Sequence, residues 1–252
     1  MNDRAERIAR WWDRAAAGYD AYFVPRFAPW VRVAVEALDN IPDGPIVVPC
    51  CGTFPELDAL LERWPDREIV GIDLSGGMVD LARKRAAGRP NVTVVQGDAA
   101  TLEPDTYAAV VSVFGLQQLP APADAIRSWA AALRTGGRLS VVYWPDIIET
   151  EGPFALLRND NSDSAWEAQL AEEVTAAGAR LERDEHPAFD MSHVDARTFI
   201  DAYTKAGPGS DYDQRDDFLR RAPEGEWHHR PRARLIVATR HLRPRTEADL
   251  NA

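Results

Sequence analysis

The chain has 252 residues, of which 45% are hydrophobic, 9% aromatic and 27% charged, and its formal net charge is −11 at pH 7. This composition is typical of a globular protein and excludes an intrinsically disordered chain. The negative charge disfavours a nucleic-acid partner, because phosphate groups would repel the chain. Its two cysteines, Cys50 and Cys51, are adjacent. This excludes a disulfide framework and leaves too few thiols for a cysteine zinc site, so we expect no metal.

The N-terminal sequence carries charges throughout and has no continuous apolar stretch, unlike a secretory signal. The longest apolar run, Tyr107 to Leu116, is about half as long as the roughly 20 residues that a membrane-spanning helix needs. We therefore expect a cytoplasmic protein without a membrane partner, present as a monomer or a homodimer.

The first predicted elements are two helices, over residues 3–19 and 27–38, within an N-terminal helical cap of residues 1–40. Short apolar runs then alternate with amphipathic segments. The runs predict strands at 46–48, 68–72, 92–95, 107–113 and 137–143, and the segments between them predict helices at 55–64, 75–87 and 123–134. This alternation indicates βαβ units around a parallel sheet whose two faces are both covered by helices.

After Trp144 the pattern changes to a helix at 164–177, a strand from Ala179, two short helices within 194–221 and a closing strand at 233–241. We therefore predict a single domain whose core, residues 45–190 and 233–243, is a Rossmann-like, doubly wound α/β sheet. Its seven strands are mostly parallel, with an antiparallel last strand. Residues 191–232 form a helical insertion, interpreted as a lid over the substrate or as a dimer surface. Residues 244–252 are expected to be a frayed polar tail.

Candidate ligand-binding residues follow three of the predicted strands, where ligands of parallel sheets bind. Pro49 to Thr53 form a turn of small residues that lets the backbone approach a ligand. Asp73 could accept hydrogen bonds from ribose hydroxyls, and Asp98, after Gly97, could accept one from an adenine amine. Each feature alone could be an ordinary turn or helix cap. Their common order favours nucleoside binding.

In these segments the sequence resembles the class I S-adenosylmethionine-dependent methyltransferases, in particular small-molecule members related to quinone-biosynthesis methyltransferases. Ile46–Phe54 is similar to the first motif of the family, Val70–Ser75 to the second and Gln96–Ala99 to the one that contacts adenine. The further similar segments are Ala16–Asp20, Ser112–Leu119, Leu133–Leu139 and, more loosely, Arg234–Thr239. The resemblance covers about residues 8 to 145.

The resemblance implies S-adenosyl-L-methionine as cofactor and transfer of its methyl group to an O-, N- or C-nucleophile of a small organic molecule, which we place in specialised metabolism. The alternative is a methyltransferase-like lyase, cyclase or pericyclase that uses the same cofactor without methyl transfer. The cofactor contacts implied are Tyr19, Pro49, Cys50, Cys51, Gly52, Thr53, Asp73, Leu74, Met78, Gly97, Asp98, Ala99, Val113, Phe114 and Gln118. The acceptor contacts predicted are Trp12, Tyr22, Phe23 and Trp144.

No catalytic residue can be assigned from the sequence. His186, His193, His228 and His229 are possible general bases, although a histidine in a loop is usually only solvated.

The first motif departs from the family at three positions. Val48 stands where the family has an acidic residue, commonly used near the methionine amino group, and Cys50 and Phe54 replace two glycines. We expect Cys50 and Cys51 to be reduced thiols at a buried turn. We also expect Phe54 to narrow the space beside the methionine part of the cofactor.

Overall fold

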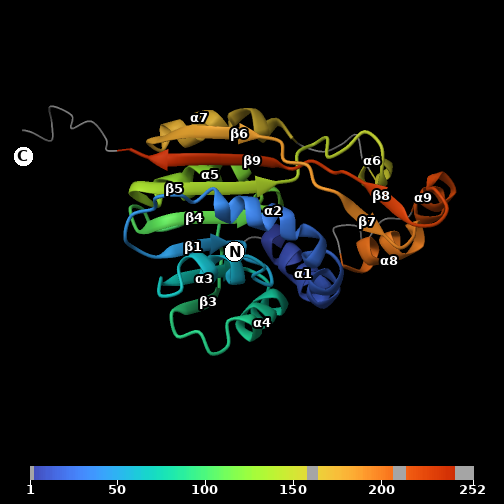
Figure 1. Ribbon diagram of the computed structural model, residues 1–252, viewed down its shortest axis with the longest axis horizontal. Coiled ribbons are helices and arrows are strands. Elements are labelled where there is room, and N and C mark those ends of the chain that lie inside the picture. Colours follow the sequence, from blue (N-terminus) through green and yellow to red (C-terminus); the bar gives the residue numbers. More distant parts are fainter. Residues whose placement is uncertain (1–2, 158–163, 207–213, 242–252) are drawn as a thin grey trace, which may run out of the picture.

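A seven-stranded sheet with the strand order β3-β2-β1-β4-β5-β9-β6 runs through the molecule (Figure 1). The computed structural model describes residues 3–157, 164–206 and 214–241. The strands of this sheet are β1 (Ile46–Pro49), β2 (Ile69–Asp73), β3 (Val92–Gln96), β4 (Tyr107–Val113), β5 (Leu133–Tyr143), β6 (Ala179–Glu185) and β9 (Arg234–Arg240). Neighbouring strands among β1 to β5 pair in parallel, whereas β9 is antiparallel to both β5 and β6. The predicted fold class is confirmed.

Helices cover both faces of this sheet. They are α2 (Val24–Glu36), α3 (Leu57–Arg63), α4 (Gly76–Arg85), α5 (Pro122–Ala131) and α7 (Leu170–Ala176), with the short helices η1 (Leu116–Gln118), α6 (Pro153–Leu157) and η2 (Ala165–Gln169). Val48 packs into one core with α2 and α3, and its neighbour Val47 packs into a second core with α5 and α7. Successive side chains of a strand point to opposite faces, so a strand between two helical layers must be apolar at every position.

The N-terminal segment differs from its prediction at one boundary. Helix α1 (Asp3–Tyr22) extends past residue 19, and α2 begins almost immediately, at Val24. Pro25 lies in the first turn of α2, where its missing N–H group removes no helical hydrogen bond. Helices α1 and α2 are nearly continuous; α2 packs on one face of the sheet, and α1 lies at its right-hand end in Figure 1.

The insertion between β6 and β9 contains the two predicted helices, here α8 (Ala196–Ala206) and α9 (Arg215–Arg221). It also contains a two-stranded antiparallel sheet of β7 (Met191–His193) and β8 (Trp227–His229), which the purely helical prediction missed. Strands of three residues are too short to show the alternation that identifies a strand. The predicted loop around Gly207 and the predicted tail lie outside the described residues.

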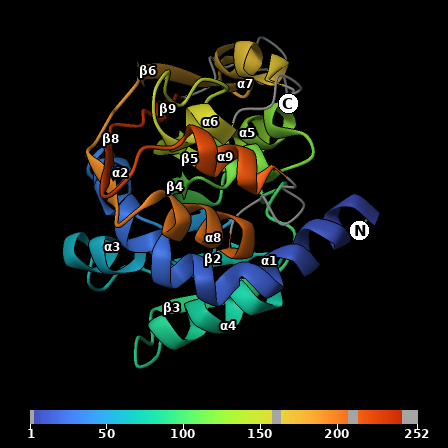
Figure 2. The same ribbon diagram turned by 90° about the vertical axis from the view of Figure 1, so that its right-hand side faces the viewer.

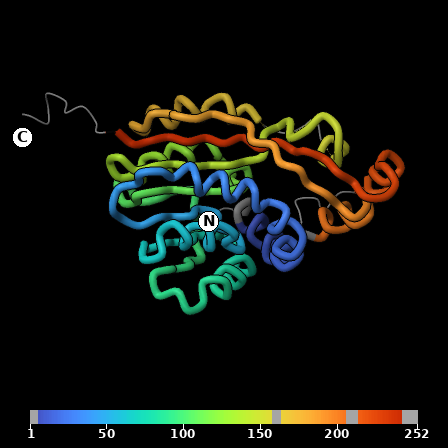
Figure 3. Tube along the Cα trace, in the orientation of Figure 1, coloured from blue at the N-terminus to red at the C-terminus, as the bar shows by residue number. Residues whose placement is uncertain are grey.

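The insertion and α1 lie side by side at the end of the sheet toward which β5 points (Figures 1 and 2). Helix α1 packs against both α8 of the insertion and α4, the helix that connects β2 and β3. It therefore lies between the insertion and this part of the sheet's helical cover. The chain trace in Figure 3 shows how the long connections from β6 and to β9 carry the insertion away from the sheet.

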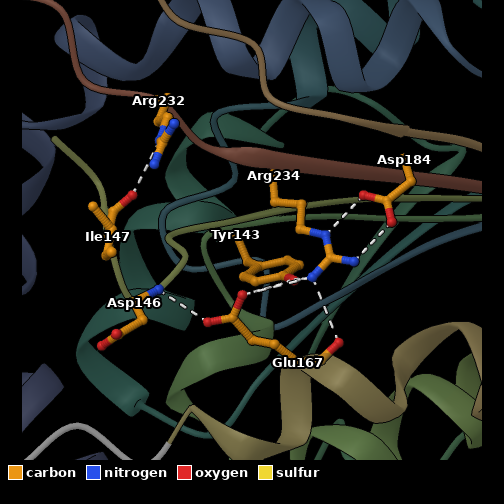
Figure 4. A network of polar contacts seen from close by, with 7 residues as sticks. All are labelled: Tyr143, Asp146, Ile147, Glu167, Asp184, Arg232 and Arg234. Carbon is orange, nitrogen blue, oxygen red and sulfur yellow. Dashed lines mark hydrogen bonds and ion pairs between the residues drawn. The ribbon is translucent and has the colours of Figure 1, made fainter.

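An ion-pair network holds the three strands at one edge of the sheet together (Figure 4). Arg234 of β9 donates from Nε and Nη2 to the carboxylate of Asp184 in β6, both at 2.7 Å, and from Nη1 to the hydroxyl of Tyr143 in β5 at 3.0 Å. Tyr143 donates in turn to Glu167 of η2 at 3.3 Å, and Glu167 accepts the backbone N–H of Asp146 at 2.9 Å. The bidentate geometry fixes the register of β9 against β6.

Candidate functional site

A cavity of about 270 Å³ lies at the carboxyl ends of the parallel strands, close to the smallest volumes usual for small-molecule sites. Thirteen of the predicted cofactor contacts line it: Tyr19, Cys50, Cys51, Gly52, Thr53, Asp73, Leu74, Met78, Asp98, Ala99, Val113, Phe114 and Gln118. Of the predicted acceptor contacts, Trp12 lines it. The residues predicted from the ends of four separate strands therefore meet in one cavity.

The structure does not bring five of the predicted residues to this cavity. Pro49 and Gly97 are absent from its lining and act through their backbones: Pro49 accepts a hydrogen bond from the Ser112 hydroxyl at 2.9 Å, and the N–H of Gly97 donates to the Asp73 carbonyl at 2.9 Å.

Among the predicted acceptor contacts, Phe23 is buried in the core, and Trp144 stacks behind Phe114 with ring centroids 4.1 Å apart. Tyr22 points to a histidine of the insertion, as described below. Their contact with an acceptor stays a prediction.

The cavity wall also contains residues that sequence reasoning missed. They are Ile8, Pro55, Ala100, Thr101, Gly115, Leu119, Pro120, Ala121, Asp124 and Ala125. Most of them belong to the connections after β3 and β4, a few residues beyond the positions that were singled out. The rule that ligands bind after strand ends would have found them if it had been applied to the whole connection.

The turn after β1 keeps a backbone that usually needs glycine. Cys50, Gly52 and Phe54 have φ angles of +54°, +52° and +67°, all in the left-handed region. These are the three glycine positions of the family motif that this segment resembles. The turn thus keeps its shape although two of the three positions are not glycine. A side chain in the left-handed region costs roughly 1–2 kcal/mol, so Cys50 and Phe54 are strained.

Glycines in β2 and in the connection after β4 make room for the two replacements. A Cβ atom added at Gly71 of β2 would lie 2.8 Å from Cε1 of Phe54, and one added at Gly115 would lie 2.5 Å from Cβ of Cys50. Phe54 is fully buried against Gly71 and is absent from the cavity lining. The expectation that Phe54 narrows the cavity is therefore wrong, because the left-handed turn directs its side chain into the core.

Asp73 connects the turn after β1 to the helix that follows β2. Its Oδ2 atom accepts the backbone N–H of Gly52 at 2.9 Å, and Oδ1 accepts that of Ser75 at 2.9 Å. Burial raises the pKa of this carboxyl, and the N–H donors of Ser75 and Gly52 oppose that shift. The backbone N–H of Leu74 lowers the pKa of this carboxyl as well. An ionised carboxylate offers about four acceptor positions, so capacity remains for a ligand at a site that faces the cavity.

Helix α1 is attached directly to this region. The Oδ1 atom of Asp13 accepts the Ser75 hydroxyl at 2.7 Å and the backbone N–H of Gly77 at 3.0 Å. A Cβ atom at Gly77 would lie 2.8 Å from the backbone carbonyl oxygen of Asp13, so glycine allows this close approach. The attachment places Trp12 and Tyr19 of α1 over the cavity.

The connection after β3 is fixed in a similar way. Oδ1 of Asp98 accepts the backbone N–H of Ala100 at 2.9 Å, and the carbonyl of Ala99 accepts the indole N–H of Trp129 at 2.7 Å. Because Trp129 is fully buried in α5, this wall of the cavity is anchored to the core.

Two buried polar atoms beside the cavity have no hydrogen-bond partner among the described residues. They are Oγ1 of Thr53, which lines the cavity, and Oε2 of Glu56, whose residue is 1% exposed. Burial raises the pKa of Glu56 to about 8. Sequence reasoning missed Glu56, although a carboxyl group so close to a motif that lacks its usual acid was a usable signal.

None of the four candidate histidine bases lines the cavity. His186 and His228 are exposed, whereas His193 and His229 are buried in the insertion. Nδ1 of His193 lies 2.8 Å from the Tyr22 hydroxyl, its Nε2 lies 2.9 Å from Nε2 of His229, and Nδ1 of His229 lies 2.8 Å from Oε2 of Glu149. One tautomer assignment satisfies every group in this chain. The Tyr22 hydroxyl donates to Nδ1 of His193, Nε2–H of His193 donates to Nε2 of His229, and Nδ1–H of His229 donates to Glu149.

Burial lowers the pKa of His193 to about 3, so this ring stays neutral in the chain of hydrogen bonds. In the described ranges, 3–157, 164–206 and 214–241, no group of three or more His, Cys, Asp or Glu residues could hold a metal ion. Within the same ranges, no helix is both long and apolar enough to span a membrane.

The strand order defines a Rossmann-like α/β protein, and its cavity carries carboxylates after β2 and β3 at the carboxyl ends of the strands. Comparison with known proteins narrows this class. Residues 46–137 match a family described as a methyltransferase domain. The chain is 33% identical to a trans-aconitate 2-methyltransferase of Acidovorax ebreus over 171 residues, which cover 68% of this chain and 63% of that protein.

The chain is also 26% identical over 154 residues to the ubiquinone/menaquinone biosynthesis C-methyltransferase UbiE of Geotalea daltonii, covering 56% of this chain and 65% of that protein. It thus spans less than two thirds of the length of either relative. A solved geranyl diphosphate C-methyltransferase from Streptomyces coelicolor has the same fold, with a TM-score of 0.61 and 13% identity over 95% of this chain and 99% of that one. These comparisons support the class I S-adenosylmethionine-dependent methyltransferase family that the motifs predicted.

Proposed function

We propose that the protein transfers the methyl group of S-adenosyl-L-methionine to a small organic molecule. The observation that carries this proposal is the meeting of two carboxylates, Asp73 after β2 and Asp98 after β3, in one cavity with a left-handed turn after β1. Carboxylates at these places suit the ribose hydroxyls and the adenine amine of a nucleoside.

The residues of the cavity suggest how the chain would hold its ligands. Asp73 would accept the ribose hydroxyls with its remaining acceptor capacity, and Asp98 would accept a hydrogen bond from the adenine amine. The backbone of Cys50 to Thr53 would contact the amino-acid part, with Tyr19 and Trp12 of α1 excluding water from above. When bound, the cofactor supplies a methyl group on a sulfonium sulfur that a nucleophile can attack.

Methyl transfer of this kind needs alignment and a dry site more than acid–base groups. This fits a cavity without a lining histidine. An acceptor that loses a proton on methylation would therefore carry an already acidic nucleophile or release its proton to water.

Several narrower statements belong to the same proposal. We place the reaction in specialised metabolism and in the cytoplasm, where the free thiols of Cys50 and Cys51 would stay reduced. The acceptor contacts would come from Trp12 and from the insertion as a lid, with the protein acting as a monomer or homodimer and without a nucleic-acid partner.

The decisive test is mass spectrometry of reactions with methyl-labelled cofactor. Trans-aconitate and a demethylmenaquinol analogue are suitable first acceptors, because the relatives are named for these substrate classes. We expect equal amounts of S-adenosylhomocysteine and of a product that carries the label. Methylthioadenosine in its place would indicate a lyase or cyclase, and a changed acceptor with intact, required cofactor would indicate a pericyclase-like role.

A further inference from the structure

Glu56 is a buried carboxyl group that the fold uses only in part: backbone N–H groups of Glu56 and Val113 lower its pKa, but its second oxygen is left over. It immediately precedes α3, but its side chain makes no capping hydrogen bond, and Oε2 has no partner among the described residues. A buried polar group without a partner destabilises the folded state, so such a group in a native protein needs an explanation. A ligand group that pairs with it would be one.

The position of Glu56 points to the cavity. Thr53 and Pro55, on the same turn, both line it, and Oγ1 of Thr53 is also unpartnered. The charge of Glu56 raises the pKa values of Tyr19 and Cys51, which line the cavity as well. Glu56 itself is absent from the lining, so its unpartnered oxygen lies behind the wall that Thr53 and Pro55 form, within electrostatic reach of Tyr19 of α1.

Among the described residues, the cation that acts on Glu56 is already paired. Arg85 of α4 is the cation that lowers the pKa of Glu56, but its guanidinium already forms an ion pair with Asp20 at 2.8 Å. Burial outweighs this attraction and holds the pKa of Glu56 at about 8, so the group is largely protonated at neutral pH. A cationic ligand group beside it would favour the carboxylate and release the proton.

The end of β1 offers no other anion. Val48 is fully buried in the core and apolar, while Asp73 and Asp98 belong to the ends of β2 and β3 and already accept backbone N–H groups. We propose that Glu56 is the anionic contact for the ammonium group of the cofactor's amino-acid part. This inference rests on the proposed cofactor, and it makes Glu56 a determinant of ligand specificity.

Calorimetric titration of two probes tests the role of Glu56. S-adenosylhomocysteine carries the amino-acid part, and methylthioadenosine shares its nucleoside and thioether but lacks that part. We expect Glu56→Gln to weaken the binding of S-adenosylhomocysteine by about tenfold or more. It should leave the binding of methylthioadenosine within about twofold of the native protein. Glu62→Gln removes an exposed charge within α3, the helix that follows Glu56, and should change neither affinity.

The pH dependence gives an independent readout. Below pH 8, binding of the ammonium group must displace the proton of Glu56, so the affinity for S-adenosylhomocysteine should rise about tenfold per pH unit from pH 6 and level off near 8. Glu56→Gln should abolish this rise. Of the groups that face Glu56, Tyr19 and Cys51 have pKa values raised above this window, which leaves Asp73 as the rival source of the proton.

The outcomes separate the two proposals. If the native protein binds neither probe, the proposed function fails. If it binds both and Glu56→Gln weakens neither or both equally, the role of Glu56 is refuted while the function stands. A pH dependence that persists in Glu56→Gln and disappears in Asp73→Asn would assign the proton to Asp73 and overturn the proposal as well. Thermal unfolding without ligand checks that Glu56→Gln is folded.

Discussion

The pairing of Phe54 with Gly71 predicts a specific coupling between two substitutions. A methyl group added by Gly71→Ala would lie 2.8 Å from Cε1 of Phe54 and 3.1 Å from Sγ of Cys51. Phe54 is fully buried and cannot move into solvent, so overpacking should lower the free energy of unfolding by about 1–3 kcal/mol.

Phe54→Gly has two opposing effects. It removes the left-handed strain of a side chain at φ +67°, worth roughly 1–2 kcal/mol. It also deletes a buried aromatic ring, which costs about 3–5 kcal/mol. The net loss of stability should therefore be about 1–4 kcal/mol. In the double variant the clash is gone and the new methyl group fills part of the cavity, so the loss should be at least about 1 kcal/mol smaller than the sum of the single losses.

Chemical denaturation of the four proteins without ligand measures this coupling. Gly97→Ala is a matched control, because its Cβ atom would meet no other atom closer than 3.8 Å, and it should not destabilise the fold. Single effects that add to within about 0.5 kcal/mol would refute the reasoning that Gly71 exists to accommodate Phe54.

Three further predictions concern the ligand, the histidines and the insertion. Asp73→Ala should weaken S-adenosylhomocysteine binding by about tenfold or more in calorimetric titration, because charge-assisted hydrogen bonds to the ribose are lost; unchanged affinity in a folded variant would remove Asp73 from the site. His193 has a pKa lowered to about 3, so unfolding takes up a proton below the unfolded pKa near 6.5. Through this histidine, the free energy of unfolding should therefore fall by about 1.4 kcal/mol per pH unit as the pH falls from 6.5 toward 3. The stability of His193→Gln should depend less steeply on pH in this range. The exposed His228→Gln control should keep the slope of the native protein. Hydrogen exchange in α8 and β8 should slow when S-adenosylhomocysteine and an acceptor bind; equal exchange with and without ligands would favour a static dimer surface.

The sequence was most informative where chemistry and topology coincide. The residues after β1, β2, β3 and β4 could be found because a parallel sheet places all its carboxyl strand ends at one edge. The direction of the Phe54 side chain could not be predicted, because it depends on a left-handed φ angle at a position where sequence rules expect glycine. The histidine chain was equally hidden, since Tyr22 and His193 are 171 residues apart and only the fold brings them together. Glu56 was overlooked because it lies two residues beyond the segment Ile46–Phe54 that resembles the first motif.

The hydrogen-bonded chain from Tyr22 to Glu149 links three parts of the molecule: α1, the connection after β5, and both strands of the small sheet in the insertion. Helix α1 also carries Trp12 and Tyr19, which line the cavity. A swing of the insertion away from the body must therefore either break this buried chain or draw α1 with it. In the second case, opening the molecule to a large substrate also uncovers the nucleoside site. Exchange of the two ligands would then occur in a single motion, and the residence time of one would depend on the presence of the other.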